Sequence, residues 1–139
     1  MRVLAVDPGG RRFGLAVADD HTGIAMPLEV VSYRGLEAAA ERIAAAAREH
    51  RAKLVVIGLP TDADGGDTPA CARSRALARA LERLAVATEL QPEHLSSHEA
   101  GRRARSSGRR PGQPVDDLAA QVIAEDFLAR RPASPEKQW

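Results

Sequence analysis

The sequence predicts an α/β fold built on a mixed five-stranded sheet flanked by helices. Three short runs of apolar and β-branched residues come first, within residues 3–31, and the links between them are too short to hold a helix. After residue 35, apolar stripes at helical spacing alternate with short continuous apolar runs. The first part therefore predicts a three-strand antiparallel meander, and the second part predicts alternating helix and strand.

The meander begins with a hairpin. Residues 3–6 are a run of small apolar residues, Pro8-Gly9-Gly10 predicts a tight turn, and residues 13–18 return as the second strand. Residues 24–31 predict the third strand. Within it, Pro27 favours an edge position, because proline has no N–H to donate to a neighbouring strand.

Helices and strands alternate in the next part of the chain. Residues 36–50 predict a helix, because their apolar residues recur on one face. Residues 53–59 contain a continuous apolar run, which is typical of a central strand covered on both faces. A glycine-rich loop then leads to Asp67-Thr68-Pro69, a capping side chain followed by proline, which predicts the start of a second helix that runs to Leu84.

The last part of the chain predicts one more strand and two more helices. Residues 86–90 predict a short fifth strand, and Ser96 with Glu99 has the spacing of a capping box that opens a helix. A loop that contains several arginines extends from residue 101 to residue 114, and residues 115–130 predict the final helix.

Composition indicates a single domain. A chain of 139 residues with 44% hydrophobic residues can bury roughly two-thirds of its unfolded surface in one core, so residues 1–131 are predicted to form one domain and residues 132–139 a disordered tail. Aromatic residues make up 3%, which argues against recognition of bases by stacking. The single cysteine cannot form an internal disulfide, and no apolar run has the length of a membrane span or a secretory signal. We therefore expect a cytoplasmic protein without membrane association.

Three acidic residues lie where a metal site could form. Asp7 ends the first strand, Glu93 follows the fifth strand, and Asp116 lies in the first turn of the final helix. Phosphodiester hydrolases use divalent cations to hold the attacking water and the leaving oxygen, and carboxylates are the ligands of hard cations such as Mg²⁺. Each acid also has a simpler explanation: a turn-forming residue for Asp7, a surface loop acid for Glu93, and a partner of the helix dipole for Asp116. The residues alone leave both explanations open.

Two adjacent acids open the final helix, and Asp116 is the better metal candidate of the two. The residues at helical spacing after Asp116 are apolar, which predicts that its side chain points inward. Asp117 shares its face with Gln121 and is expected to point toward solvent or to interact with the helix dipole.

Four segments of the chain together resemble one known family. They are Asp7-x-Gly9 with Arg12-x-Gly14-x-Ala16-Val17-x-Asp19; Val55-Val56-Ile57-Gly58-Leu59-Pro60 with Asp64-Gly65; Glu93-His94-Leu95-Ser96-Ser97-x-Glu99-Ala100; and Val115-Asp116-Asp117-Leu118-Ala119-Ala120. Each segment alone is a weak signal. Their order and spacing over residues 1–128 are similar to those of the YqgF/RuvX family.

The resemblance implies a ribonuclease H-like fold and a metal-dependent nuclease. The implied activity is 5′-end processing of precursor 16S rRNA during ribosome biogenesis, with cleavage of Holliday junctions in branched DNA as the alternative. The resemblance also implies that Asp7, Glu93 and Asp116 are the catalytic residues and the ligands of one or two Mg²⁺ or Mn²⁺ ions. Where the family pattern has an acid before the glutamate and an arginine after it, this chain has Pro92 and His94.

Arginines in two segments are candidates for binding the phosphate backbone. They are Arg11 and Arg12 in the first turn, and Arg102, Arg103, Arg105, Arg109 and Arg110 in the loop over residues 101–114. The second segment contains no acid, so it is strongly basic although the net charge of the chain is only +1. Phosphate contacts of this kind give an affinity that falls with salt and carries little sequence information. The alternative is a solvated basic loop.

The expected partner is therefore nucleic acid, RNA in preference to branched DNA, together with ribosomal precursor particles. The expected oligomeric state is a monomer or a weak homodimer, since paired incision of a junction would need a symmetric dimer. Two other classes stay open. One is a non-catalytic module that binds nucleic acid or the ribosome, and the other is an actin-like ATPase, whose two lobes a single domain cannot supply.

Overall fold

The computed structural model of the chain describes residues 1–62, 64–93 and 116–130. Its elements, in chain order, are β1 (Arg2–Pro8), β2 (Arg12–Asp19), β3 (Ile24–Ser32), α1 (Leu36–Glu49), β4 (Leu54–Leu59), α2 (Pro69–Arg83), β5 (Thr88–Pro92) and α4 (Asp116–Arg130). The predicted third helix near Ser96, the arginine loop over residues 101–114 and the tail over residues 132–139 lie outside the described residues.

The strands form one five-stranded sheet in the order β3-β2-β1-β4-β5. The β1–β2 and β2–β3 pairs are antiparallel, whereas the β1–β4 and β4–β5 pairs are parallel. This arrangement confirms the predicted mixed sheet, with a meander followed by alternating helix and strand. Pro27 lies in β3, at the edge of the sheet, as predicted.

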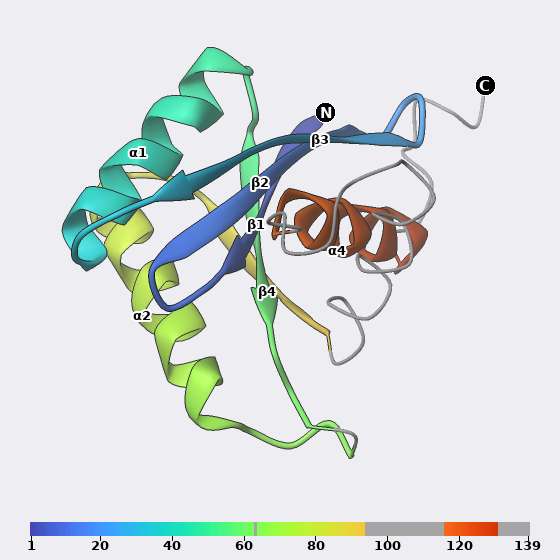
Figure 1. The fold of residues 1–139 in the computed structure, drawn as a ribbon. Helices are drawn as coiled ribbons and strands as arrows, with labels where there is room; N and C mark the ends of the chain where they lie inside the picture. Colours follow the sequence, from blue (N-terminus) through green and yellow to red (C-terminus); the bar gives the residue numbers. More distant parts are fainter. Residues whose placement is uncertain (63, 94–115, 131–139) are drawn as a thin grey trace, which may run out of the picture.

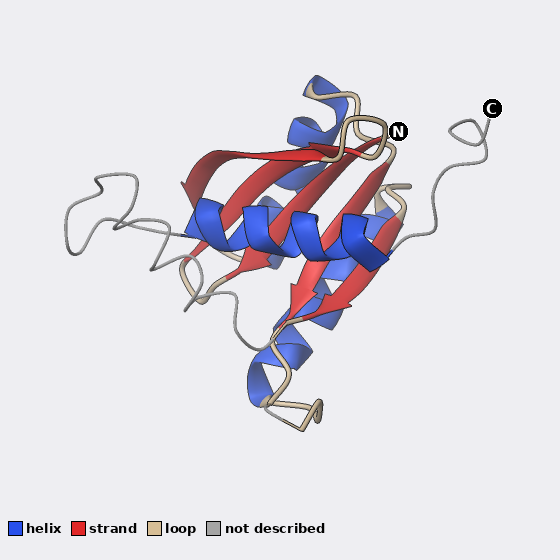
Figure 2. Ribbon diagram, turned by 90° about the vertical axis from the view of Figure 1, so that its right-hand side faces the viewer, coloured by secondary structure: helices blue, strands red, loops and turns tan. Residues whose placement is uncertain are grey.

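Helices cover both faces of the sheet. Helices α1 and α2 pack on one face, and α4 lies across the other (Figures 1 and 2). Successive side chains of a strand point to opposite faces of the sheet, so the core consists of two clusters, one on each face. On β1, Leu4 and Val6 belong to the cluster with α1 and α2, whereas Val3 and Ala5 belong to the cluster with α4.

The predicted boundaries agree with the structure except at the fifth strand. Thr68 is the N-cap of α2, as the sequence indicated. The strand β5 is Thr88–Pro92, two residues later than predicted, and it continues through Pro92. Since Glu93 N–H donates to the carbonyl of Leu59 on β4, the ring nitrogen of Pro92 faces the free edge of the sheet, where no donor is needed.

Helix α4 packs closely on the sheet because glycines face it. A Cβ atom on Gly58 of β4 would lie 2.5 Å from Cδ1 of Ile123. The glycine therefore makes room for the helix.

In the part of the chain that the structure describes, no helix has the length and apolar character needed to cross a membrane.

Candidate active site

The carboxylate of Asp7 lies at the carboxyl end of β1, on the face that α4 covers. Alternation places Asp7 on the same face as Val3 and Ala5, which pack against α4. In the neighbouring strand β2, the residue paired with Asp7 is Gly14. Asp7 is partly buried, so its carboxylate stands between the sheet and the start of α4.

Gly14 allows α4 to begin directly on the sheet. A Cβ atom at this position would lie 1.9 Å from the carbonyl oxygen of Asp116 and 2.5 Å from the amide nitrogen of Asp117. No side chain can occupy that space. The absence of a side chain at Gly14 therefore brings Asp116 beside Asp7, although more than a hundred residues separate the two in the sequence.

Arg12 is the cationic partner of Asp116. Its Nε donates to Oδ2 of Asp116 at 2.6 Å, which makes a charge-assisted hydrogen bond. Arg12 lies two residues before Gly14 in β2 and therefore on the same face of the sheet. The Arg12 side chain is 50% exposed and that of Asp116 is 22% exposed, so this ion pair lies at the rim of the site.

Burial and the nearby charge of Asp116 raise the pKa of Asp7 from 3.8 to about 6. Between about pH 4 and pH 6 the folded protein keeps a proton on Asp7 that the unfolded chain has lost. The free energy of unfolding therefore falls as the pH rises through this range, by up to about 3 kcal/mol. An ionised Asp7 is destabilising unless a cation offsets its charge, and raised pKa values of this kind are typical of functional sites.

If Asp7 were a turn-forming residue, its carboxylate would accept a hydrogen bond from a glycine N–H of the turn, but the N–H of Gly9 has another partner. Gly9 N–H donates to the carbonyl of Arg12 at 2.9 Å, and the hydroxyl of Tyr33 donates to the carbonyl of Gly9 at 2.6 Å. The turn is thus held by backbone and tyrosine hydrogen bonds. Arg11, the other candidate arginine of this turn, is exposed, and its carbonyl accepts from Tyr33 N–H.

Asp117 does not point toward solvent, one of the two orientations that the sequence predicted; it interacts with an N–H of the first turn of α4, which agrees with the other. Asp117 is buried, with 7% of its surface exposed, and its Oδ1 accepts from the N–H of Leu118. The apolar pattern could not place the two acids, because α4 is apolar around most of its circumference and its first turn sits directly against Gly14. The prediction that Asp116 points inward was wrong, since its side chain is the more exposed of the two. Asp116 is nevertheless the acid that lies beside Asp7.

Glu93 lies at the same end of the sheet as Asp7, where the parallel strands β1, β4 and β5 have their carboxyl ends. It continues the ladder beyond β5, since its N–H donates to Leu59 at 2.8 Å, and alternation places it on the α4 face with Gln91. Within residues 1–62, 64–93 and 116–130, no three His, Cys, Asp or Glu side chains form a group that could hold a metal ion. The structure thus brings Asp7 and Asp116 together and leaves Glu93 outside that pair.

Two residues near these acids were not identified as functional from the sequence. Gln91 is buried, and its Nε2 donates to Oε1 of Glu93 at 3.4 Å. A polar residue two positions before Glu93 in a strand was the available signal, because alternation puts both on one face. Gly14 was identified only as part of a motif, and nothing local to its sequence reveals the contact with α4.

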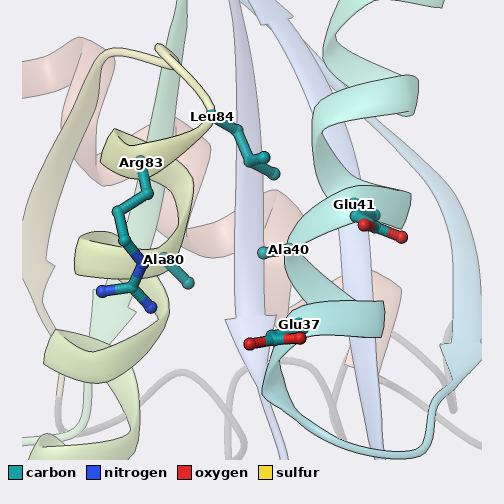
Figure 3. Close-up of a pocket in the computed structure, with 6 residues that line it drawn as sticks. All are labelled: Glu37, Ala40, Glu41, Ala80, Arg83 and Leu84. Atoms are coloured by element: carbon teal, nitrogen blue, oxygen red, sulfur yellow. The ribbon is translucent and has the colours of Figure 1, made fainter.

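The remaining candidate residues are outside this region. His94 and the arginines at positions 102, 103, 105, 109 and 110 lie outside the described residues. A hollow of about 150 Å³ lies between α1 and α2, where Glu37 and Glu41 stand opposite Arg83 and Leu84 (Figure 3). It is on the face of the sheet opposite Asp7 and Asp116, and it is smaller than usual small-molecule sites.

Comparison with known proteins adds the family. The family model of RuvX, described as Holliday junction resolvase, matches residues 1–130. This chain belongs to the RuvX family. It is thereby a member of a family of nucleases, hydrolases that cleave phosphodiester bonds.

Relatives of this RuvX protein are similar over nearly their whole length. A protein of Anaeromyxobacter sp. (strain Fw109-5), named "Putative pre-16S rRNA nuclease", is 42% identical over 137 residues, which cover 96% of this chain and 100% of the relative. A protein of Nitrosospira multiformis with the same name is 35% identical over 135 residues, which cover 94% of this chain and 89% of the relative.

Solved structures confirm the ribonuclease H-like fold of this RuvX protein. RuvC of Thermus thermophilus, in complex with a Holliday junction substrate, has a TM-score of 0.57 at 19% identity and covers 94% of this chain and 96% of its own. The fowlpox virus resolvase, in complex with Holliday junction DNA, has a TM-score of 0.54 at 10% identity and covers 93% and 97%. At these identities the likeness concerns the fold.

Proposed function

We propose that this RuvX protein is a metal-dependent nuclease that hydrolyses a phosphodiester bond of precursor 16S rRNA, in the processing of its 5′ end. The names of the relatives support the substrate. The observation that carries the activity is the pair of carboxylates, Asp7 and Asp116, brought together over Gly14 at the carboxyl end of β1. A pair of adjacent acids in a protein of a nuclease family is suited to binding a hard divalent cation.

The chemistry of this site fits Mg²⁺ or Mn²⁺. The raised pKa of Asp7 indicates that negative charge there is poorly compensated, and the oxygen ligands are those that such ions prefer. Asp7 and Asp116 would hold the cation, and Glu93, on the same face, is the proposed third ligand. A bound cation would activate the attacking water and stabilise the charge on the departing oxygen.

The surrounding residues support these ligands. Gln91 restrains the carboxylate of Glu93 through its hydrogen bond, and Asp7 must lose its proton before it can bind a cation. Arg11, Arg12 and the arginines at positions 102, 103, 105, 109 and 110 are proposed to bind the phosphate backbone. We further propose that the protein acts in the cytoplasm on ribosomal precursor particles, as a monomer or a weak homodimer.

Cleavage assays on defined substrates test the proposal. A precursor 16S rRNA fragment with an extended 5′ end and a four-way DNA junction are incubated with the protein, with and without Mg²⁺ or Mn²⁺. We expect metal-dependent cleavage of the RNA, abolished by Asp7→Asn. The matched control is Asp67→Asn, which makes the same change at an exposed acid paired with Arg75.

The outcomes distinguish the candidate functions. Cleavage of the junction alone would favour the resolvase activity that the family description names. Binding without cleavage of either substrate would indicate a non-catalytic module. Cleavage of the RNA by Asp7→Asn at the normal rate would contradict the assigned site.

The salt dependence of binding tests the arginines. We expect the Kd for the RNA to rise steeply between about 50 and 200 mM salt, and less steeply when Arg102 and Arg103 are replaced by Ala. A Kd that does not change with salt would contradict the proposed phosphate contacts.

A further inference from the structure

The ion pair between Arg12 and Asp116 connects a proposed phosphate contact with a proposed metal ligand. Oδ2 of Asp116 already accepts a hydrogen bond from the guanidinium of Arg12, at 2.6 Å. Among the described residues, Arg12 is the cation that is paired with this acid. A divalent ion bound between Asp7 and Asp116 would therefore approach a carboxylate that carries a positive partner.

The guanidinium and a metal ion oppose each other at this site. Both are cationic and both are attracted to the same carboxylate, so they repel each other there and each weakens the attraction of Asp116 for the other. Gly14 fixes the start of α4 against β2, so Asp116 cannot withdraw from Asp7 in order to serve the two cations separately. The mobile partner is Arg12, whose long side chain is half exposed at the rim of the site.

We propose that Arg12 is a resident counter-ion of Asp116 that a divalent cation displaces, and that the freed guanidinium then binds a phosphate of the nucleic acid. This inference rests on the proposed metal site. An ion pair with one partner half exposed contributes little to stability, so breaking it requires little free energy. A guanidinium also binds phosphate well, because its N–H groups match two phosphate oxygens at once.

A consequence is that cation and nucleic acid reinforce each other's binding. The cation releases Arg12 for the phosphate, and the phosphate removes Arg12 from competition for Asp116. Thermodynamic linkage requires the two effects to be equal in size. Without a cation, Arg12 stays on Asp116 and neutralises part of the acidic pair.

Calorimetric titration with Mn²⁺ tests the displacement. Removing a competing cation should make Arg12→Ala bind Mn²⁺ about two- to fivefold more tightly than the unmodified protein, as expected for the loss of an exposed ion pair. The matched control is Arg42→Ala. Arg42 lies in α1, on the opposite face of the sheet from α4, and forms an exposed ion pair with Glu29 of β3. The control should bind Mn²⁺ as the unmodified protein does.

Fluorescence anisotropy tests the phosphate contact. A short RNA with phosphorothioate linkages, which slow cleavage, is titrated with and without Mn²⁺. The gain in RNA affinity on adding Mn²⁺ should be at least threefold larger for the unmodified protein and for Arg42→Ala than for Arg12→Ala.

The results separate the inference from the proposed function. Mn²⁺ binding by Arg12→Ala that equals that of the unmodified protein, or is weaker, would overturn the displacement, because Arg12 would then be neutral toward the cation or would help to orient Asp116. An equal gain in RNA affinity would overturn the phosphate contact. If the unmodified protein does not bind Mn²⁺, the proposed metal site itself is wrong, and the inference is overturned with it.

Discussion

The substitution Gly14→Ala tests how the two acids are brought together. Its Cβ atom would lie 1.9 Å from the carbonyl oxygen of Asp116, whereas an ordinary contact begins at 3.4 Å. The start of α4 must therefore move away from β2 by about 1.5 Å. Because Asp7 stays on β1, the shift separates Asp116 from Asp7.

The expected effect on catalysis is large and the effect on stability is moderate. A displacement of about 1 Å at a reacting centre can reduce the rate about 10²-fold, so kcat/KM for metal-dependent RNA cleavage should fall at least that much. Overpacking of this kind destabilises by about 1–3 kcal/mol, which most domains tolerate. Urea unfolding measures the stability, and the cleavage assay is run on protein shown to be folded.

A neighbouring glycine supplies the control. At Gly10, in the turn between β1 and β2, the one contact that an added Cβ atom would make among the described residues is with the guanidinium of Arg73, at the ordinary distance of 3.8 Å. Gly10→Ala should retain activity and stability. If Gly14→Ala is folded and cleaves within about threefold of the unmodified rate, the approach of α4 over Gly14 does not position the acids, and the reasoning is refuted.

Three further predictions concern single side chains. Asp7→Asn should abolish cleavage yet raise the free energy of unfolding at pH 8, in metal-free buffer, by up to about 3 kcal/mol, with little gain at pH 4. The reason is that it removes the buried charge of Asp7, whose pKa is raised to about 6. An equal gain at both pH values in urea titrations would contradict this cause. Gln91→Leu should lower kcat about 10- to 100-fold through a misplaced Glu93, and an unchanged kcat would show that Glu93 does not depend on this contact. Ser74→Ala should cost about 1–3 kcal/mol in thermal or urea unfolding without changing kcat, because its fully buried hydroxyl donates to the carbonyl of Gly58 at 2.7 Å; a loss of activity at unchanged stability would contradict a purely structural role.

Most of the fold was predictable because local patterns report it. Apolar runs and short turns predicted the five strands at their places along the chain. Helical spacing with the Asp67-Thr68-Pro69 start predicted α2. The start of β5 was misplaced by two residues, since its short run of mixed polarity lacks a sharp boundary. The relative exposure of Asp116 and Asp117 was predicted the wrong way round, because their environment depends on contacts with β2 that the pattern of α4 does not encode.

By itself, the sequence determined that Asp7 ends a core strand and that Asp116 opens a helix, because capping, turns and periodicity act over a few residues. Only the tertiary structure decided that these acids meet. Arg12 and Asp116 are 104 positions apart, and what joins them is a glycine opposite Asp7 that lets a helix rest on the sheet. Steric fit between distant segments has no periodic signature in the chain, so it becomes visible only when the helix and the sheet are packed.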